Sequence, residues 1–430
     1  MTKRAITQNM LNVKDWQQKS ARGLALNVPF DYVRQFSQRP FIDYGDIAQF
    51  NRPELFYSVG FTTVTFHLNA ADHSVYLRAL GKYGSNPNAP KSVKTLDSVI
   101  KFSSDLLLYT KAYPRASFTF SPGTTGIMQG GWFSRGLHIL AGATPFFNGG
   151  PVVIDGEVDF PGSPIFSADV YYSDPTPNWG GASFINGAVK YPFVFGITMP
   201  PSSPNYYLTY NTLNTGNSVT PSSQTWKFGY DISALPANRS FFTILEEAGH
   251  PRHVYPEAGA ILLAENTALF LEGPVHGRVT VVCTGNGTPV GPAYNIMSGS
   301  KNVRVTGNVV IGTHSLTYDH GSGLTADSTH AFMLMVSSHV VFAHEDNFDA
   351  PINFSGVIYS WTTGPYGKFL DAKNTGGPHS LTISGVDTAG LYYWWYPNSD
   401  MINVCDPGLA RYPPPGLPET PRVVSLKPSY

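Results

Sequence analysis

Apolar and polar residues alternate with a period of two over three segments in the first quarter of the chain. The segments cover residues 61–68, 74–80 and 92–102. Because successive side chains of a β-strand point to opposite faces, this alternation predicts strands with one buried face. The short connections between the segments predict an antiparallel meander.

A helix is predicted upstream of these strands. Residues 9–26 contain no proline, whereas Pro29 follows shortly afterwards, and proline ends or kinks a helix. The apolar positions within this helix form a poor stripe. Residues 1–110 therefore predict a small unit made of one helix and an antiparallel sheet.

The central part of the chain repeats a glycine that has an apolar residue two positions before it and two positions after it. Such repeats predict stacked units, in which glycine at a corner supplies a positive φ. We expect a right-handed β-solenoid over residues 111–400, with the apolar runs 331–336 and 338–342 as strands packed on its core. A β-sandwich with glycine turns is the alternative. The repeats occupy residues 153–158, 184–189, 270–275, 304–309, 353–358 and 382–386, which suggests a unit near 30 residues with insertions. The last repeat is imperfect, because Asp387 takes the place of the second apolar residue.

Residues 401–430 differ from the rest because they are rich in proline. The run Pro413–Pro415 favours an extended backbone that cannot donate a regular ladder of hydrogen bonds. We expect this tail to cap the end of the solenoid, with residues 423–426 adding one closing strand.

Composition supports a mainly β protein and narrows the functional classes. Charged residues make up 13% of the 430 residues, about half the usual share, while 42 glycines and 35 prolines oppose a helix-rich fold. The net charge is −1, so no global field recruits nucleic acid or a membrane surface. A surface with so few charges is more usual outside cells, which favours an extracellular location.

From about residue 75 onward the chain resembles the PilX-like pilus-assembly proteins and large minor pilins of the competence type. Glycine-and-apolar motifs carry the resemblance, and their order along the chain makes it specific. They are Leu80–Gly84 with residues 93–99, Phe147–Gly156, Phe270–Gly273 with residues 277–282, Val303–Val309, and Tyr412–Pro418.

The resemblance implies a pilin-like start that carries a β-solenoid. It implies a non-enzymatic structural or adhesive part of an extracellular type IV pilus-like filament, a minor pilin or tip protein without a cofactor. Other pilin subunits would be its partners, with DNA or surface glycans as ligands. Such proteins begin with a hydrophobic helix, whereas this chain starts Met-Thr-Lys-Arg and carries Lys14, Asp15 and Lys19. That departure puts the pilin role in question.

DNA binding needs clusters of Lys and Arg that contact phosphates. The first 110 residues hold 13 Lys and Arg, but 8 Asp and Glu are scattered among them. The remainder of the chain is net acidic, which repels a polyanion. DNA is therefore expected only at a local patch.

Motifs for common catalytic chemistry are absent from the sequence. It contains no GxGxxG after a strand, no GxxxxGK[ST], no GxSxG and no HExxH. Two acidic groups resemble the carboxylate pairs of glycoside-cleaving β-helices, namely Glu246 with Glu247, and Asp155, Glu157 and Asp159 along one predicted strand face. A polysaccharide-binding or polysaccharide-cleaving β-helix is therefore the alternative function, although an exposed strand face explains these acids equally well.

One group of possible metal ligands stands out. It consists of His339, His344, Glu345, Asp346 and Asp349, whose nitrogen and carboxylate ligands suit a divalent ion. In a strand, however, His339 and His344 would lie on opposite faces. A polar corner is therefore the favoured interpretation, and no metal is expected.

Aromatic clusters are the candidate binding residues. Exposed Tyr and Trp side chains are favoured contact residues, and burial beneath the proline-rich tail is the alternative. The first cluster is Tyr392, Tyr393, Trp394, Trp395 and Tyr396, expected beside the tail; the second is Tyr206, Tyr207 and Tyr210, within a stretch that has no charged residue.

The chain has two cysteines, Cys283 and Cys405. In an oxidising compartment the pair could form one disulfide that ties the tail to the body. Two buried free thiols are the alternative.

Overall fold

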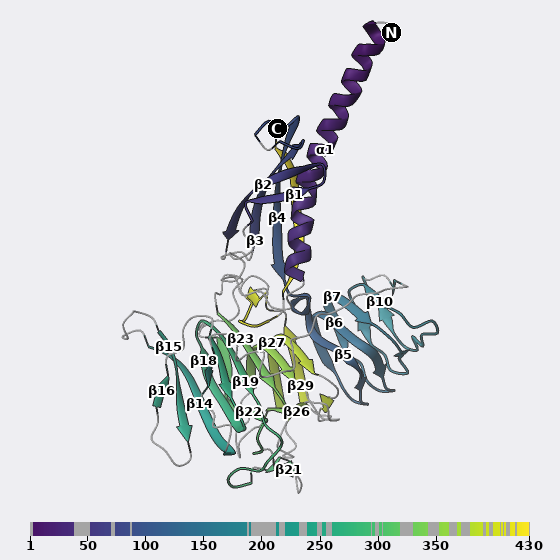
Figure 1. Ribbon diagram of the computed structural model, residues 1–430. Helices are drawn as coiled ribbons and strands as arrows, with labels where there is room; N and C mark the ends of the chain where they lie inside the picture. The colour runs from purple at the N-terminus through teal and green to yellow at the C-terminus, as the bar shows by residue number, and fades with distance from the viewer. Residues whose placement is uncertain are drawn as a thin grey trace. The chain divides into compact units, whose positions relative to one another are not determined.

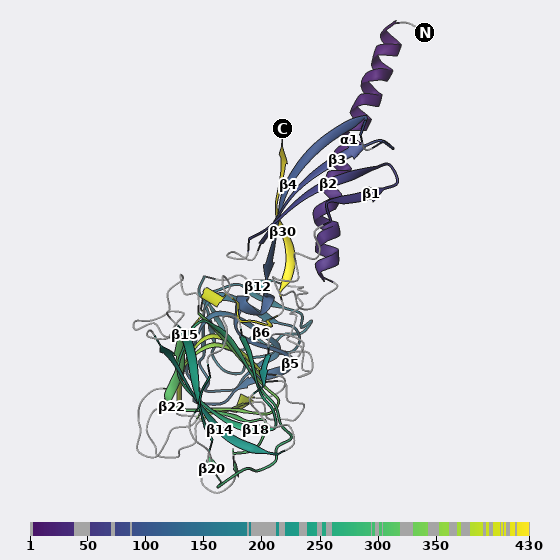
Figure 2. The ribbon, with the colours of Figure 1, turned by 60° about the vertical axis from the view of Figure 1, so that its left-hand side comes forward.

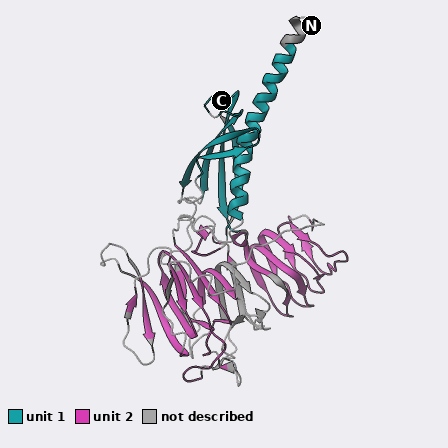
Figure 3. Cartoon of the chain, in the orientation of Figure 1, with its two compact units in different colours: residues 1–104, 418–430 teal, residues 105–417 magenta. Residues whose placement is uncertain are grey.

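The computed structural model confirms a mainly β protein and divides the chain into two compact units (Figure 3). Unit 1 comprises residues 1–104 and 418–430, and unit 2 comprises residues 105–417. The structure describes the chain except for residues 1–2, 38–51, 70–73, 87, 187–188, 191–211, 215–219, 232–238, 247–251, 255–259, 294, 297–300, 303, 319–329, 343–351, 361–367, 371–378, 390–392, 395–398, 405, 407, 410–412, 418 and 430.

Unit 1 is one long helix packed on an antiparallel sheet (Figure 2). The strands follow the order β1-β2-β3-β4-β30, so the last strand of the chain joins the sheet beside β4. The three predicted meander strands are confirmed. Residues 423–426 lie in a strand, as predicted, but that strand joins the sheet of unit 1 and not the body formed by residues 111–400. The elements are α1 (Lys3–Ser37), β1 (Glu54–Tyr57), β2 (Gly60–Asn69), β3 (Ser74–Tyr83), β4 (Ser92–Ser103) and β30 (Thr420–Ser429).

The helix continues through Pro29 instead of ending there, so the predicted end was wrong. A proline inside a helix costs about 3 kcal/mol, but each large apolar side chain that becomes buried contributes roughly 1.5–3 kcal/mol. Burial on the sheet therefore outweighs the local penalty. The buried stripe, which the sequence pattern did not reveal, is Ala21, Leu24, Ala25, Val28, Tyr32 and Phe36.

No described helix is both long and apolar enough to cross a membrane.

Unit 2 begins with η2 (Asp105–Leu108) and a set of parallel strands that we call the first run. Residues that pair between neighbouring strands are separated by a short, regular number of positions in the sequence: Val170 pairs with Val152 and with Val189. This spacing of 18 and 19 residues is shorter than the predicted unit of 30. The first run is β5 (Tyr109–Phe120), β6 (Gly126–Ile139), β7 (Phe146–Ile154), β8 (Val158–Asp159), β9 (Ile165–Phe166), β10 (Val170–Tyr172), β11 (Ser183–Phe184) and β12 (Val189–Lys190).

The second run contributes two parallel series to the same large, curled sheet (Figure 1). One series is β13-β17-β19-β23-β25-β27, and the other is β14-β18-β22-β24-β26-β28. Strand β15 pairs antiparallel with both β14 and β16. The bounds are β13 (Thr212–Asn214), β14 (Ser222–Asp231), β15 (Arg239–Glu246), β16 (Arg252–Val254), β17 (Ala260–Ala264), β18 (Thr267–Val275), β19 (Arg278–Cys283), β22 (Val309–Tyr318), β23 (Ala331–Val336), β24 (Val340–Phe342), β25 (Ile352–Ser360), β26 (Lys368–Leu370), β27 (His379–Ala389), β28 (Tyr393–Trp394) and β29 (Ser399–Val404), with a separate pair β20 (Asn295–Ile296) and β21 (Lys301–Asn302).

The end of the second run pairs with the start of the first. Strand β27 aligns Asp387 with Lys111 of β5, and β29 aligns Ile402 with Ile127 of β6, in parallel register. Strands, rather than the proline-rich tail, therefore cover this edge, so the expected cap was wrong.

The core of unit 2 is continuous along these strands. Every residue of β17 and β23 is buried, as expected for parallel strands covered on both faces, and the apolar runs predicted to be core strands are confirmed as β23 and β24. In the first run Phe147, Phe166 and Phe184 stack, with ring centroids 4.9 and 5.3 Å apart.

Glycine at a corner is required where β25 bends. Gly356 has φ 132°, and a Cβ there would lie 2.4 Å from the carbonyl oxygen of Phe332 on the neighbouring strand. A side chain is therefore excluded both by the backbone conformation and by the neighbouring backbone.

The predicted domain boundaries at 110 and 400 shift, and the tail divides between the units. Residues 401–404 belong to β29, and residues 420–429 form β30. Between them the tail lies along β19: Arg278 Nε donates to Pro413 O at 2.9 Å, and Thr280 Oγ1 donates to Pro415 O at 2.5 Å. Leu409 and Leu417 are buried there.

Lys111 should make the stability of the protein depend on pH. Its side chain is fully buried, and burial holds its pKa well below the usual value. The unfolded chain therefore binds the extra proton between that depressed pKa and about 10.4, so the free energy of unfolding rises with pH in this window by up to about 1.36 kcal/mol per pH unit.

We expect Lys111→Met to remove this slope in urea unfolding measured from neutral pH to pH 10, whereas Lys101→Met, at an exposed position, should keep it. Identical slopes in the native protein and Lys111→Met would contradict the assignment.

Candidate functional site

A pocket of about 440 Å³ with both polar and apolar walls lies on the first run of unit 2. We call it the Asp174 pocket. Two chain segments that follow successive strands, β7 and β10, line it together with the short strand β8. The lining residues are Gly156, Glu157, Val158, Asp159, Ser173, Asp174, Pro175, Thr176 and Asn178.

Asp174 is the buried carboxylate of the pocket. Its Oδ2 accepts a hydrogen bond from Val158 N at 2.8 Å, and its Oδ1 accepts one from Thr176 N at 2.8 Å. These backbone donors hold the pKa of Asp174 below its usual value, because they stabilise the charged form. The group therefore remains an anion at neutral pH.

The remaining acids lie around the rim and make weaker contacts. Asp159 accepts a hydrogen bond from Asn178 Nδ2 at 2.7 Å. Glu157 is 69% exposed in its side chain, with His138 Nε2 at 3.7 Å. The pocket thus presents three carboxylates, which can only accept hydrogen bonds when ionised.

Gly156 allows the chain to turn at the pocket. It has φ 153°, and a Cβ there would meet Arg135 O at 2.0 Å. This glycine of the predicted repeat therefore marks a corner between β7 and β8.

That corner corrects one prediction. Asp155, Glu157 and Asp159 do not share a strand face, because β7 ends at Ile154 and β8 begins at Val158. Glu157 and Asp159 line the pocket, while Asp155 accepts a hydrogen bond from Ser173 Oγ at 3.3 Å. Sequence reasoning missed Asp174, Thr176 and Asn178; their only local signal was the turn-forming composition of residues 173–178, which does not reveal proximity to residue 157.

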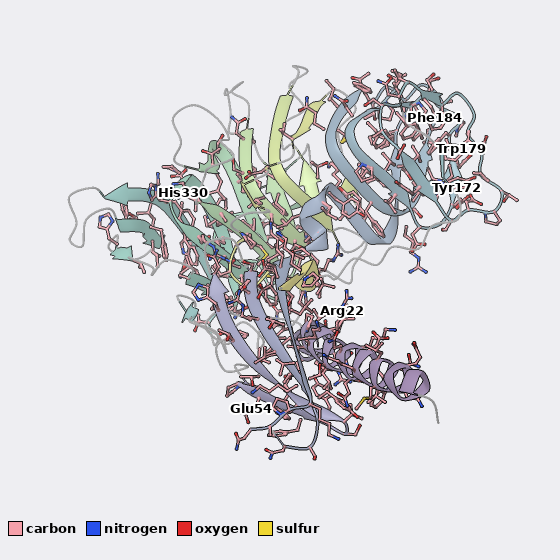
Figure 4. All side chains as sticks on the ribbon, turned by 90° about the horizontal axis from the view of Figure 1, so that it is seen from above. Arg22, Glu54, Tyr172, Trp179, Phe184 and His330 are labelled. Atoms are coloured by element: carbon pink, nitrogen blue, oxygen red, sulfur yellow. The ribbon has the colours of Figure 1, made fainter. Side chains whose placement is uncertain are left out.

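Aromatic residues beside the pocket pack into the core. The rings of Tyr172 and Trp179 are 5.2 Å apart at 90°, and Trp179 contacts Phe184 at 5.5 Å (Figure 4). All three are partly buried against the first-run core.

Most of the predicted aromatic binding residues lie outside the described part of the chain. Tyr393 and Trp394 form β28 and align with Lys368 and Phe369 of β26. Tyr392, Trp395, Tyr396, Tyr206, Tyr207 and Tyr210 fall outside the described residues.

Cys283 is a free, buried thiol, so the predicted bridge to Cys405 is not formed here. Its Sγ donates to Thr267 O at 3.3 Å within the core, and burial raises its pKa. The strand β19 holds this side chain inside, because every residue from Val279 to Cys283 is buried. Cys405 itself lies outside the described residues.

His339 does not join a metal site among the residues that the structure describes. Its Nδ1 lies 2.7 Å from Ser338 Oγ and 3.2 Å from Asn308 Oδ1. His344, Glu345, Asp346, Asp349 and Glu247 are outside the described ranges, whereas Glu246 ends β15.

A second candidate surface is the N-terminal half of α1 in unit 1. Four large apolar side chains are more than half exposed there: Met10 at 70%, Leu11 at 56%, Trp16 at 55% and Val13 at 54%. Trp16 has an edge contact with Tyr83, at 5.1 Å between ring centroids. The helix extends beyond the sheet on which its C-terminal half packs (Figure 1).

Comparison of the chain with protein-family models, curated proteins and solved structures gives no match.

The Asp174 carboxyl does not have the property that a general acid in glycoside cleavage needs. Glycoside cleavage needs one carboxyl whose pKa is raised so that it can donate a proton. The buried carboxyl of Asp174 is shifted in the opposite direction. Carboxylate-rich walls instead suit ligands that offer hydrogen-bond donors, namely cationic side chains or hydroxyl groups.

Asp174 should make the stability of unit 2 fall in acid. Because its folded pKa lies below the unfolded value of about 3.9, its contribution is present above that value and is lost as pH falls through the folded pKa. We expect Asp174→Asn to destabilise the protein at neutral pH and to flatten this acid limb in thermal unfolding. The control is Asp155→Asn, at an exposed position. Parallel curves for Asp174→Asn and the native chain would contradict the prediction.

Proposed function

We propose that the chain is a non-enzymatic structural or adhesive subunit of an extracellular, pilus-like filament, located at the cell surface. In this proposal the exposed half of α1 joins the subunit to other filament components, and unit 2 is the displayed body. One observation carries it: a helix that buries its C-terminal half on a sheet and leaves four large apolar side chains exposed in its N-terminal half. Exposed apolar surface of this kind is typical of assembly surfaces.

The finer form of the proposal concerns unit 2. We propose that its two runs wind as a right-handed β-solenoid. Parallel pairing between strands that follow one another at short spacings supports this winding, because parallel crossovers within one sheet are almost always right-handed. An elongated stack of this kind would offer a large surface for adhesion.

Substitutions at exposed positions of α1 test the assembly role. Met10→Ser and Leu11→Ser should leave folding within about 0.5 kcal/mol, because surface substitutions rarely cost more. We expect the double variant to lose labelling of surface filaments in immunogold negative-stain microscopy of cells that produce it. The matched control is Leu108→Ser, since Leu108 of unit 2 is 58% exposed.

Labelling of the Met10→Ser, Leu11→Ser variant at the native level would contradict the role of α1. Antibody label confined to the cytoplasm for the native chain would contradict the filament proposal altogether.

Polysaccharide binding is a second candidate function, favoured by the Asp174 pocket. Its Asn178 amide, carboxylates and hydroxyl groups can hydrogen-bond to sugar hydroxyls. We expect a neutral hexose oligosaccharide to bind the native chain in calorimetry and to lose about tenfold affinity on Asn178→Ala. No difference between the two proteins, or release of reducing sugars that is lost on Asp155→Asn, would contradict simple binding at this pocket.

A further inference from the structure

The two units carry opposite net charges. Unit 1 contains 15 Lys and Arg against 8 Asp and Glu, whereas unit 2 contains 13 against 21. The near-neutral net charge of the chain is therefore the sum of a positive unit and a negative unit. Oppositely charged surfaces attract over about 10 Å at moderate salt, so a positive unit of one copy and a negative unit of another favour contact.

The packing stripe of α1 continues past the edge of its own sheet. Ala21, Leu24 and Val28 are buried in unit 1. Going towards the N-terminus in steps of three and four residues, the same face carries Gln17, Lys14 and Met10. Lys14 and Met10 are exposed, so the continuation of an established packing face presents both an apolar and a cationic group.

The same helix of a second copy would pack poorly on this stripe. In a parallel bundle the same positions of each helix meet, which would place Lys14 against Lys14. The exposed apolar residues Met10, Leu11, Val13 and Trp16 also spread over roughly 220° of the helix circumference, too wide for a narrow helix–helix seam. The only acid among residues 8–20, Asp15, is already paired with Lys19 at 2.8 Å.

The acidic residues at the Asp174 pocket are complementary in charge to this stripe of α1. Glu157 is exposed at the rim of the pocket, beside Asp174, and Asp155 is exposed next to it, where it accepts a hydrogen bond from Ser173 of the pocket. The cavity of about 440 Å³ has apolar as well as acidic walls, since Val158 and Pro175 line it. Such a surface can take a cationic side chain together with an adjoining apolar one.

We propose that the N-terminal half of α1 docks on the acidic rim of the Asp174 pocket in a second copy of this chain. The inference rests on the proposed filament function and names the partner of α1. Because the two contacting surfaces differ, the interface is heterologous: each copy offers one donor and one acceptor surface, and association continues into an open chain.

Paired charge reversals in the full chain test this contact by sedimentation velocity. The helix variant is Lys14→Glu with Lys19→Glu; both positions are exposed and lie in the N-terminal half of α1. The rim variant is Asp155→Lys with Glu157→Lys. The control is Lys91→Glu with Lys101→Glu, which makes the same charge change in unit 1 at exposed positions outside α1.

We expect the native chain, freed of nucleic acid, to associate with rising concentration at about 0.1 M salt and to dissociate at about 1 M salt. The helix variant and the rim variant should each weaken association at least about tenfold, while the control associates like the native chain. Combining all four substitutions of the helix and rim variants in one chain should restore association, because the charges are complementary again. This recovery separates a lost contact from a lost fold.

Several results would overturn the contact. A rim variant that associates normally while the helix variant does not would indicate helix-to-helix packing. A combined variant that stays monomeric, a control as defective as the helix variant, or association that requires an added oligonucleotide would equally exclude it. These measurements are independent of filament labelling in cells, so labelled filaments without charge rescue would remove this inference alone.

Discussion

The architecture of unit 2 depends on the parallel pairing of β27 and β29 with β5 and β6. A strand edge that is left open carries unpaired N–H and C=O groups, which pair with another chain or with water. Here the last strands of the second run cover the edge of the first strands of the first run. The chain therefore returns to its own starting strands, and β30 then adds to the sheet beside β4.

This closure places an unusual residue in the core. Lys111 lies on β5 in register with Asp387 of β27, at the one repeat where an acid replaced the second apolar residue. A fully buried lysine disfavours its charged form, so proton binding at this junction opposes folding. The glycine corners, by contrast, depend on geometry. At Gly156 and Gly356 the backbone conformation and the close approach of a neighbouring strand require glycine.

The two units differ in the sign of their net charge. A net charge of −1 over the whole chain suggested no electrostatic partner, yet the excess of Lys and Arg in unit 1 is matched by the excess of acids in unit 2. The exposed half of α1 adds apolar area to positive charge, and the Asp174 pocket adds a cavity to negative charge. Complementary surfaces on one chain favour growth by addition of copies, which is the property that a filament subunit needs.

Local sequence patterns were enough to predict the features that depend on neighbouring residues. The period of two predicted β2, β3 and β4, and the apolar runs predicted β23 and β24 as core strands. Glycine-centred repeats predicted corners such as Gly356. These signals are local, because strand alternation and positive φ are set by adjacent residues.

Only the tertiary structure decided the features that join distant residues. The helix passes through Pro29 because a sheet buries Val28 and Tyr32, which no local propensity reports. Asp174 meets Val158 only because the first run stacks one strand on the next, and the Cys283 thiol is buried because β19 lies in the core. The pairing of Asp387 with Lys111 joins positions far apart in sequence, and periodicity carries no information about which strand edge another strand will cover.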